Sequence, residues 1–133
     1  MGTATGILTD PDILIGIARQ LARPFVPSPD CRAGDVAAAL LTAAGNVYTG
    51  ICIDTACSLG FCAEHAAAAE MLKAREAEVR MVVAVDSRGE VLPPCGRCRE
   101  LLWQLHPRNV ETQIVLGRGR VRRLAELLPE RGT

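Results

Sequence analysis

The stretch from residue 62 to residue 107 alternates between two kinds of pattern. It reads CAEHAAAAEML at 62–72, RMVVAVD at 80–86 and CGRCRELLWQLHP at 95–107. The first and third segments are rich in strong helix formers, and Pro107 ends the third. The second segment is a short apolar run rich in valine, which is typical of a buried strand. The stretch therefore predicts a helix, a buried strand and a second helix in succession.

Four further segments precede this stretch. Residues Asp12–Arg23 carry apolar side chains at helical spacing, and either of two aspartates at the start can cap the helix that they predict. Residues Phe25–Gly34 show no period and are expected to form a loop. Val36–Thr42 and Val47–Ile53 are short apolar runs on either side of a turn, which predicts a β-hairpin.

Two segments follow it. Thr112–Leu116 is a further candidate strand, and Arg122–Leu128 predicts a short closing helix. The resulting order α-β-β-α-β-α-β-α is typical of an α/β domain with a mixed sheet and helices packed on it. The chain has 133 residues, so we expect a single domain over residues 1–133.

Composition and charge restrict the function classes. Lys plus Arg and Asp plus Glu are 15 each, so the net charge is zero and gives no steering toward nucleic acid. One Trp, one Tyr and two Phe are too few for a stacking platform. No signal peptide or membrane-spanning run is expected, which predicts a cytoplasmic protein. Six cysteines in that reducing compartment indicate metal binding or catalysis before disulfides.

Two motifs carry the chemistry. Cys62-Ala63-Glu64 and Pro94-Cys95-Gly96-Arg97-Cys98 each stand at the start of a predicted helix. Cys95 and Cys98 are three residues apart and project to one side of a helix. A catalytic zinc site has three protein ligands and a water in the fourth position, so Cys62, Cys95 and Cys98 are the candidate ligands. Glu64 is the candidate general base, and the joint pattern matches that of zinc deaminases.

Alternatives to each assignment stay open. Cys95 and Cys98 could form a redox dithiol or half of a structural zinc site, and Glu64 could be a plain surface acid. Three thiolates with Zn²⁺ carry a net charge of −1, and Arg97 or Arg99 could offset it. The arginines near the C-terminus are most simply a solvated face, although they could bind a phosphate or a neighbouring subunit; they are Arg118, Arg120, Arg122 and Arg123.

On these two motifs the chain resembles the cytidine deaminase superfamily over most of its length. Segments 81–94, 96–107 and 124–129 are similar to its blasticidin S deaminase branch. The resemblance implies a three-layer α/β/α domain with a mixed five-stranded sheet and a homotetramer with active sites near subunit interfaces. It also implies a Zn²⁺ cofactor and hydrolysis of cytidine or deoxycytidine to the uridine form with release of ammonia.

The chain departs from the family pattern around the sugar. The Asn-x-Glu pair that holds the ribose in the family is Cys52-x-Asp54 here, so these two side chains are the candidate substrate contacts. The backbone N–H near Ala63 is a candidate donor to the ring carbonyl. The family's aromatic residue before the first strand falls near Gly34, so no ring is expected there, and the family's Arg after the catalytic Glu is His65.

We therefore expect a zinc-dependent hydrolytic deaminase of a cytosine-type nucleoside, such as cytidine, deoxycytidine or blasticidin S. The alternatives are a deaminase of another small aminated heterocycle and a non-catalytic zinc-binding paralogue. A polynucleotide deaminase is disfavoured by the zero net charge and the few aromatic residues.

Overall fold

The computed structural model describes residues 10–130. The helices are α2 (Pro11–Leu21), α3 (Ala63–Lys73), α4 (Gly96–Leu105) and α5 (Leu124–Leu127), with short 3-10 turns η1 (Ala56–Ser58) and η2 (Pro107–Glu111). The strands are β1 (Phe25–Ser28), β2 (Cys31–Thr42), β3 (Val47–Thr55), β4 (Val79–Asp86), β5 (Val91–Leu92), β6 (Gln113–Gly117) and β7 (Arg120–Arg123). Among residues 10–130, no helix is long and apolar enough to span a membrane.

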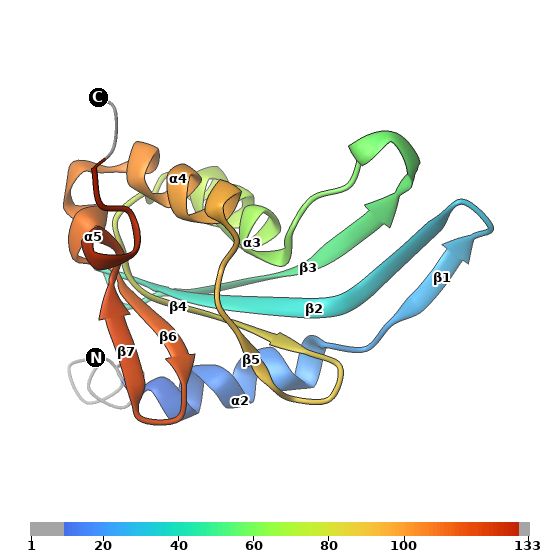
Figure 1. The fold of residues 1–133 in the computed structure, drawn as a ribbon, viewed down its shortest axis with the longest axis horizontal. Coiled ribbons are helices and arrows are strands. Elements are labelled where there is room, and N and C mark those ends of the chain that lie inside the picture. Colours follow the sequence, from blue (N-terminus) through green and yellow to red (C-terminus); the bar gives the residue numbers. More distant parts are fainter. Residues whose placement is uncertain (1–9, 131–133) are drawn as a thin grey trace.

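The seven strands in residues 10–130 belong to one mixed sheet (Figure 1). Strands β3, β2, β4, β6 and β7 lie side by side in that order. The β4–β6 pair is parallel and the other pairs are antiparallel. Short strand β1 pairs with the beginning of β2, and short strand β5 pairs with the end of β4. The mixed sheet is therefore confirmed, and β1 and β5 extend the expected five strands to seven.

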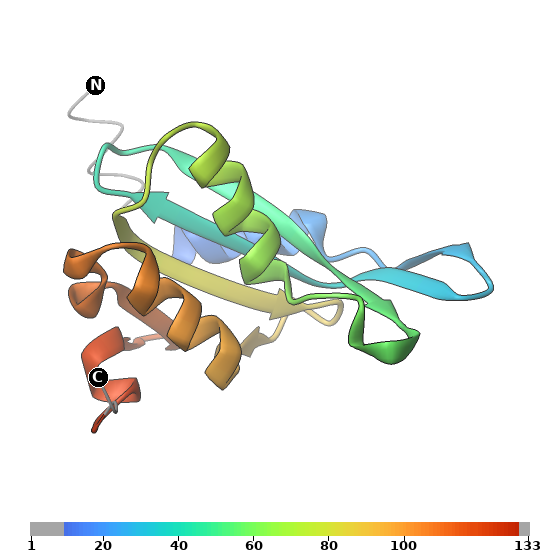
Figure 2. The same ribbon diagram turned by 90° about the horizontal axis from the view of Figure 1, so that it is seen from above.

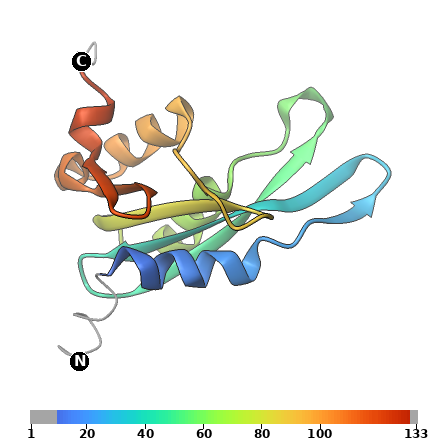
Figure 3. The same ribbon diagram turned by 60° about the horizontal axis from the view of Figure 1, so that its bottom comes forward.

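Helices cover both faces of the sheet, which confirms the three-layer arrangement. Helix α2 crosses one face, and α3, α4 and α5 lie on the other (Figures 1 and 3). Strand β2 shows why this is stable, because its buried side chains alternate between the two cores. Ala37, Ala39 and Leu41 pack in the α2 core. Ala38 and Leu40 pack in the α3 core.

The expectation of a loop over Phe25–Gly34 is wrong. Residues 25–28 form β1, which pairs antiparallel with the beginning of β2. All four β1 residues are exposed, so no buried face imposes an alternation on the sequence. This hairpin projects from the body of the sheet beside the end of β3 (Figure 1).

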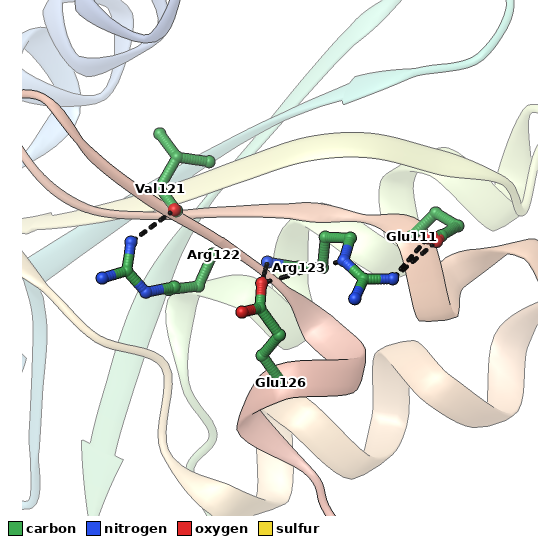
Figure 4. Close-up of polar contacts among 5 residues, drawn as sticks. All are labelled: Glu111, Val121, Arg122, Arg123 and Glu126. Atoms are coloured by element: carbon green, nitrogen blue, oxygen red, sulfur yellow. Dashed lines mark hydrogen bonds and ion pairs between the residues drawn. The ribbon is translucent and has the colours of Figure 1, made fainter.

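The expected helix Arg122–Leu128 begins only at Leu124, because residues 120–123 pair with β6 as strand β7. Arg123 marks the change from strand to helix (Figure 4). Its guanidinium contacts Glu111 at 2.9 Å, and its backbone N–H donates to Glu126 Oε1 at 2.9 Å. The side chain of Arg122 donates to the carbonyl of Val121 at 3.0 Å. Two of the four clustered arginines thus make local contacts, as a solvated face would.

Candidate functional site

Helices α3 and α4 begin at cysteines and start at the same end of the sheet (Figure 2). Cys62 is the N-cap of α3 and Cys95 is the N-cap of α4, and both have extended backbone conformations. The first turn of a helix presents unpaired N–H groups and a partial positive charge, which favours a thiolate. The two motifs predicted at helix starts therefore do stand there.

Gly50 of β3 fixes the position of α3. A Cβ atom at this position would lie 2.4 Å from Ala67 N, 2.5 Å from Ala66 Cβ and 2.7 Å from the carbonyl of Ala63. The helix backbone therefore rests directly on the strand, and only glycine permits this distance. This contact sets the height of Cys62 and Glu64 above the sheet.

The three predicted ligand cysteines lie together. Cys62 Sγ is 3.6 Å from Cys95 Sγ, and Cys95 Sγ is 3.5 Å from Cys98 Sγ. The Cys62 and Cys98 ligand atoms lie within 4.8 Å of each other. A tetrahedral zinc ion about 2.3 Å from each sulfur separates the sulfurs by about 3.8 Å. The residues therefore fit a three-thiolate zinc site.

The three thiols differ in electrostatic surroundings. Burial works to raise the pKa of Cys95, but the backbone N–H of Cys98 and the neighbouring thiols outweigh it and leave the pKa lowered. Burial, followed by the contact with Cys95, raises the pKa of Cys62. Burial, followed by the charge of Glu64, raises the pKa of Cys98 strongly. A bound metal ion would offset the burial of these groups, because cysteine binds metal as the thiolate.

Glu64 lies on the first turn of α3 with only 6% of its surface exposed. Burial raises its pKa, while its own backbone N–H and the thiol of Cys98 oppose this shift. A carboxyl group with a raised pKa retains an accepted proton more readily and can therefore act both as a base and as an acid. Its place in a cavity is what such a role requires.

That cavity has a volume of about 420 Å³ and opens over the site. Cys62, Cys95 and Glu64 line one side of it. The predicted substrate contacts Cys52, Asp54 and Ala63 line it as well. The structure thus brings together six of the seven residues that the sequence indicated, and the seventh, Cys98, adjoins Cys95 behind them.

An acidic group forms the cavity wall contributed by β2 and β3. Ligand atoms of Asp35, Cys52 and Asp54 lie within 4.8 Å of one another. The buried Cys52 sulfur accepts from the backbone N–H of Val36 at 3.3 Å and donates to Asp54 Oδ2 at 3.7 Å. Arg32 forms an ion pair with Asp35 at 2.8 Å. Asp35 was not indicated by the sequence, because it lies nineteen residues from Asp54 along the chain and only the β2–β3 pairing brings them together.

Phe61 also lines the cavity and was not foreseen. Its backbone pairs with Ile53 through hydrogen bonds of 3.0 and 3.1 Å, which fix it beside the end of β3. Gly34 offers no ring, as expected, and its φ of 84° with Arg23 O only 2.4 Å from a Cβ position leaves no room for a side chain. A ring is nevertheless present, and its one sequence signal was its position directly before Cys62.

Arg97 and Arg99, the two candidates to offset the negative charge of a three-thiolate zinc site, have different positions. Arg99 donates to the carbonyls of Pro94 at 2.9 Å and Leu127 at 3.3 Å, so it fastens the segment before α4 to α5. Arg97 lines the cavity. His65, in contrast, places Nδ1 3.5 Å from Cys98 Sγ. Burial and then the charge of Arg97 lower the pKa of His65, which favours its neutral form.

Known proteins resemble this chain in sequence and fold. No family model matches the chain. Cytidine deaminase of Mycobacterium tuberculosis (strain ATCC 25618 / H37Rv) is 33% identical over 124 residues, which cover 91% of this chain and 88% of that protein. The crystal structure of cytidine deaminase from Mycobacterium tuberculosis matches with a TM-score of 0.78 at 34% identity, over 93% of this chain and 98% of that one. That of cytidine deaminase from Mycobacterium leprae matches with a TM-score of 0.75 at 28% identity, over 90% and 97%. The chain therefore belongs to the cytidine deaminase family.

Proposed function

We propose that the chain is a zinc-dependent hydrolytic deaminase of a cytosine-type nucleoside, which releases ammonia. The observation that carries this proposal is a buried glutamate, Glu64, in one cavity with the thiols of Cys62 and Cys95. The names of the relatives support a cytosine-type substrate. A fold alone would not support it, because one fold serves many reactions.

Cys62, Cys95 and Cys98 are the proposed zinc ligands, on the 3.5 and 3.6 Å separations of their sulfur atoms. When bound there, zinc supplies a Lewis acid and lowers the pKa of a water molecule. The two helix N-termini stabilise the thiolates of Cys62 and Cys95. The same cysteines favour the cytoplasm as the compartment, because thiols stay reduced there.

Glu64 is the proposed catalytic acid–base. Its carboxylate accepts one proton from the attacking water and delivers it to the ring nitrogen. It then accepts the proton of the hydroxyl group formed on the ring carbon and delivers it to the amine, which leaves as ammonia while the carbonyl forms. Burial raises the pKa of Glu64, and a raised pKa matches this double role because the carboxyl group then retains an accepted proton more readily than an exposed glutamate does. The low exposure of the side chain keeps bulk water away from the proton.

The opposite wall is the proposed sugar side of the site. Asp54 and Cys52 replace the pair that holds the ribose in the family, and Asp54 can accept hydrogen bonds from hydroxyl groups. The backbone N–H of Ala63 is the proposed donor to the ring carbonyl, because the first N–H groups of a helix have no partner within it. We further propose one domain over residues 1–133 and a homotetramer, in line with the family resemblance.

A substrate panel tests this proposal. Cytidine, deoxycytidine, cytosine, blasticidin S and an aminopurine nucleoside are each incubated with the zinc-loaded protein, and ammonia is measured. We expect release from at least one cytosine-type nucleoside and its loss in Glu64→Ala. Glu70→Ala is the matched control, because Glu70 lies on the same helix but is exposed.

Two results would contradict the proposal. Full activity of Glu64→Ala would remove the catalytic role of Glu64. Bound zinc without ammonia release from any member of the panel would favour the non-catalytic paralogue. Release from the aminopurine alone would instead favour the alternative of another aminated heterocycle.

A further inference from the structure

We propose that His65 is a positioning residue whose Nδ1–H donates a hydrogen bond to the Cys98 thiolate and thereby strengthens zinc binding. This inference rests on the zinc site of the proposed function but not on the reaction. Its starting observation is the 3.5 Å distance between His65 Nδ1 and Cys98 Sγ. A ring nitrogen of His65 also lies within 4.8 Å of the ligand atom of Cys62.

Cys98 needs such a donor because of its burial. Its side chain is 0% exposed, whereas Cys62 and Cys95 stand at helix N-caps and reach the cavity. A buried charge is costly unless a hydrogen bond compensates it. The thiolate of Cys98 is therefore the ligand that gains most from a nearby N–H group.

The side chains around Cys98 Sγ identify the donor. The side chains of Cys95, Cys62, Glu64 and His65 interact with it. In the zinc-loaded site the other two sulfurs are thiolates and Glu64 is an acceptor when ionised, so none of them donates. Among these neighbours the imidazole supplies the N–H. Arg99, which the sequence also suggested, is engaged with two backbone carbonyls instead.

His65 is a donor in this arrangement and not a fourth ligand. The cavity is lined by Cys62, Cys95 and Glu64, and neither Cys98 nor His65 is among its lining residues. A substrate reaches the site through the cavity, which Glu64 lines. His65 contacts the sulfur of Cys98, which is itself fully buried. A hydrogen bond to a ligand from outside the coordination sphere tunes affinity without closing the site.

Zinc affinity of the full chain tests the role of His65. Competition with a chromophoric chelator gives the Kd for zinc of the wild type, His65→Ala and His65→Asn, with His106→Asn as the matched control. Asparagine retains an N–H donor of similar reach, whereas alanine removes it. We expect the Kd to rise about 10- to 100-fold in His65→Ala and to remain near the wild-type value in the two asparagine variants.

The absorption spectrum of the Co²⁺-substituted protein supplies a second readout, which would not change if His65 had a purely structural role. Loss of a hydrogen bond makes a thiolate a stronger electron donor, so the thiolate-to-Co²⁺ charge-transfer band of His65→Ala should shift to longer wavelength. An unchanged Kd in His65→Ala would overturn the proposal. A Kd for His65→Asn as weak as that of His65→Ala would also overturn it, because a metal ligand would behave in that way.

These outcomes are separate from those of the substrate panel. A protein that binds zinc in a His65-dependent manner but releases no ammonia would contradict only the proposed function. An active deaminase whose zinc affinity is the same in wild type and His65→Ala would contradict only this inference.

Discussion

Replacing Gly50 with alanine should displace helix α3 and thereby the site residues at its start. The added Cβ would lie 2.4 Å from Ala67 N and 2.7 Å from the Ala63 carbonyl, which are backbone atoms of α3. Ordinary contact begins near 3.4 Å, so α3 must move away from β3 by about 1 Å. Overpacking of this kind costs about 1–3 kcal/mol. A displacement of about 1 Å at catalytic groups costs about 100-fold in rate.

Two measurements check this prediction. Urea unfolding should show a free energy of unfolding lower by about 1–3 kcal/mol, and zinc affinity should fall because Cys62 moves with α3 while Cys95 and Cys98 stay. Gly16→Ala is the matched control, since a Cβ there meets no atom within 4 Å. That helical change should stabilise the protein by about 0.5–1 kcal/mol. A Gly50→Ala variant with wild-type stability and zinc affinity would refute the role assigned to this contact.

Three further outcomes are expected. Asn109→Ala should lower the free energy of unfolding by about 3 kcal/mol in a denaturant titration. The buried amide accepts a hydrogen bond from the N–H of Val79 at 2.8 Å and donates to the carbonyls of Ala77 and Leu102 at 3.1 and 2.9 Å. A loss below about 0.5 kcal/mol would contradict this. Glu76→Gln should lower the free energy of unfolding at pH 7, because contacts from the side chains of Thr42 and then Tyr48 lower the pKa of Glu76 in the folded state. The carboxylate of Glu76 stops stabilising the fold when it is protonated, so the difference between wild type and variant should disappear as the pH falls below 4.5. A difference in the free energy of unfolding that stays constant across pH would contradict this. Removing zinc with a chelator should lower Tm, since free zinc at 100 times its Kd adds about 2.7 kcal/mol to the free energy of unfolding. A Tm that the chelator does not change would show that no stabilising ion is bound.

The positions of the proposed zinc ligands were predictable from the sequence because they depend largely on local geometry. Cys95 and Cys98 are one helical turn apart, and a helix start next to a cysteine can be recognised from helix propensity alone. Glu64 follows Cys62 by two residues, so its place beside the sulfur atoms is also a local matter. All of these residues lie where the spacing predicted.

The rest of the site depends on contacts between distant segments. Asp35 and Phe61 line the cavity because β2 pairs with β3 and because residue 61 bridges to Ile53. No short-range pattern carries that information. His65 could be seen in the sequence as a departure from the family, but its contact with Cys98 requires the packing of α3 beside α4.

The secondary structure likewise contains elements that local sequence patterns predict and elements that depend on contacts between distant segments. The buried strand β4 was recognised to within one residue, because burial imposes an apolar run. Strand β1 is fully exposed and β7 is rich in arginine, so neither has an apolar pattern. These strands form because an existing edge of the sheet offers them hydrogen bonds, a tertiary effect that overrides local propensity.

The central claim is that Glu64 performs proton transfer in a site whose zinc is held by Cys62, Cys95 and Cys98. The most direct measurement determines zinc content and ammonia release from the best nucleoside of the panel on the same samples of wild type and Glu64→Gln. We predict about one zinc per chain in both proteins, and a turnover at least about 100-fold lower in the variant. A Glu64→Gln protein that retains zinc and turns over at the wild-type rate would contradict the account.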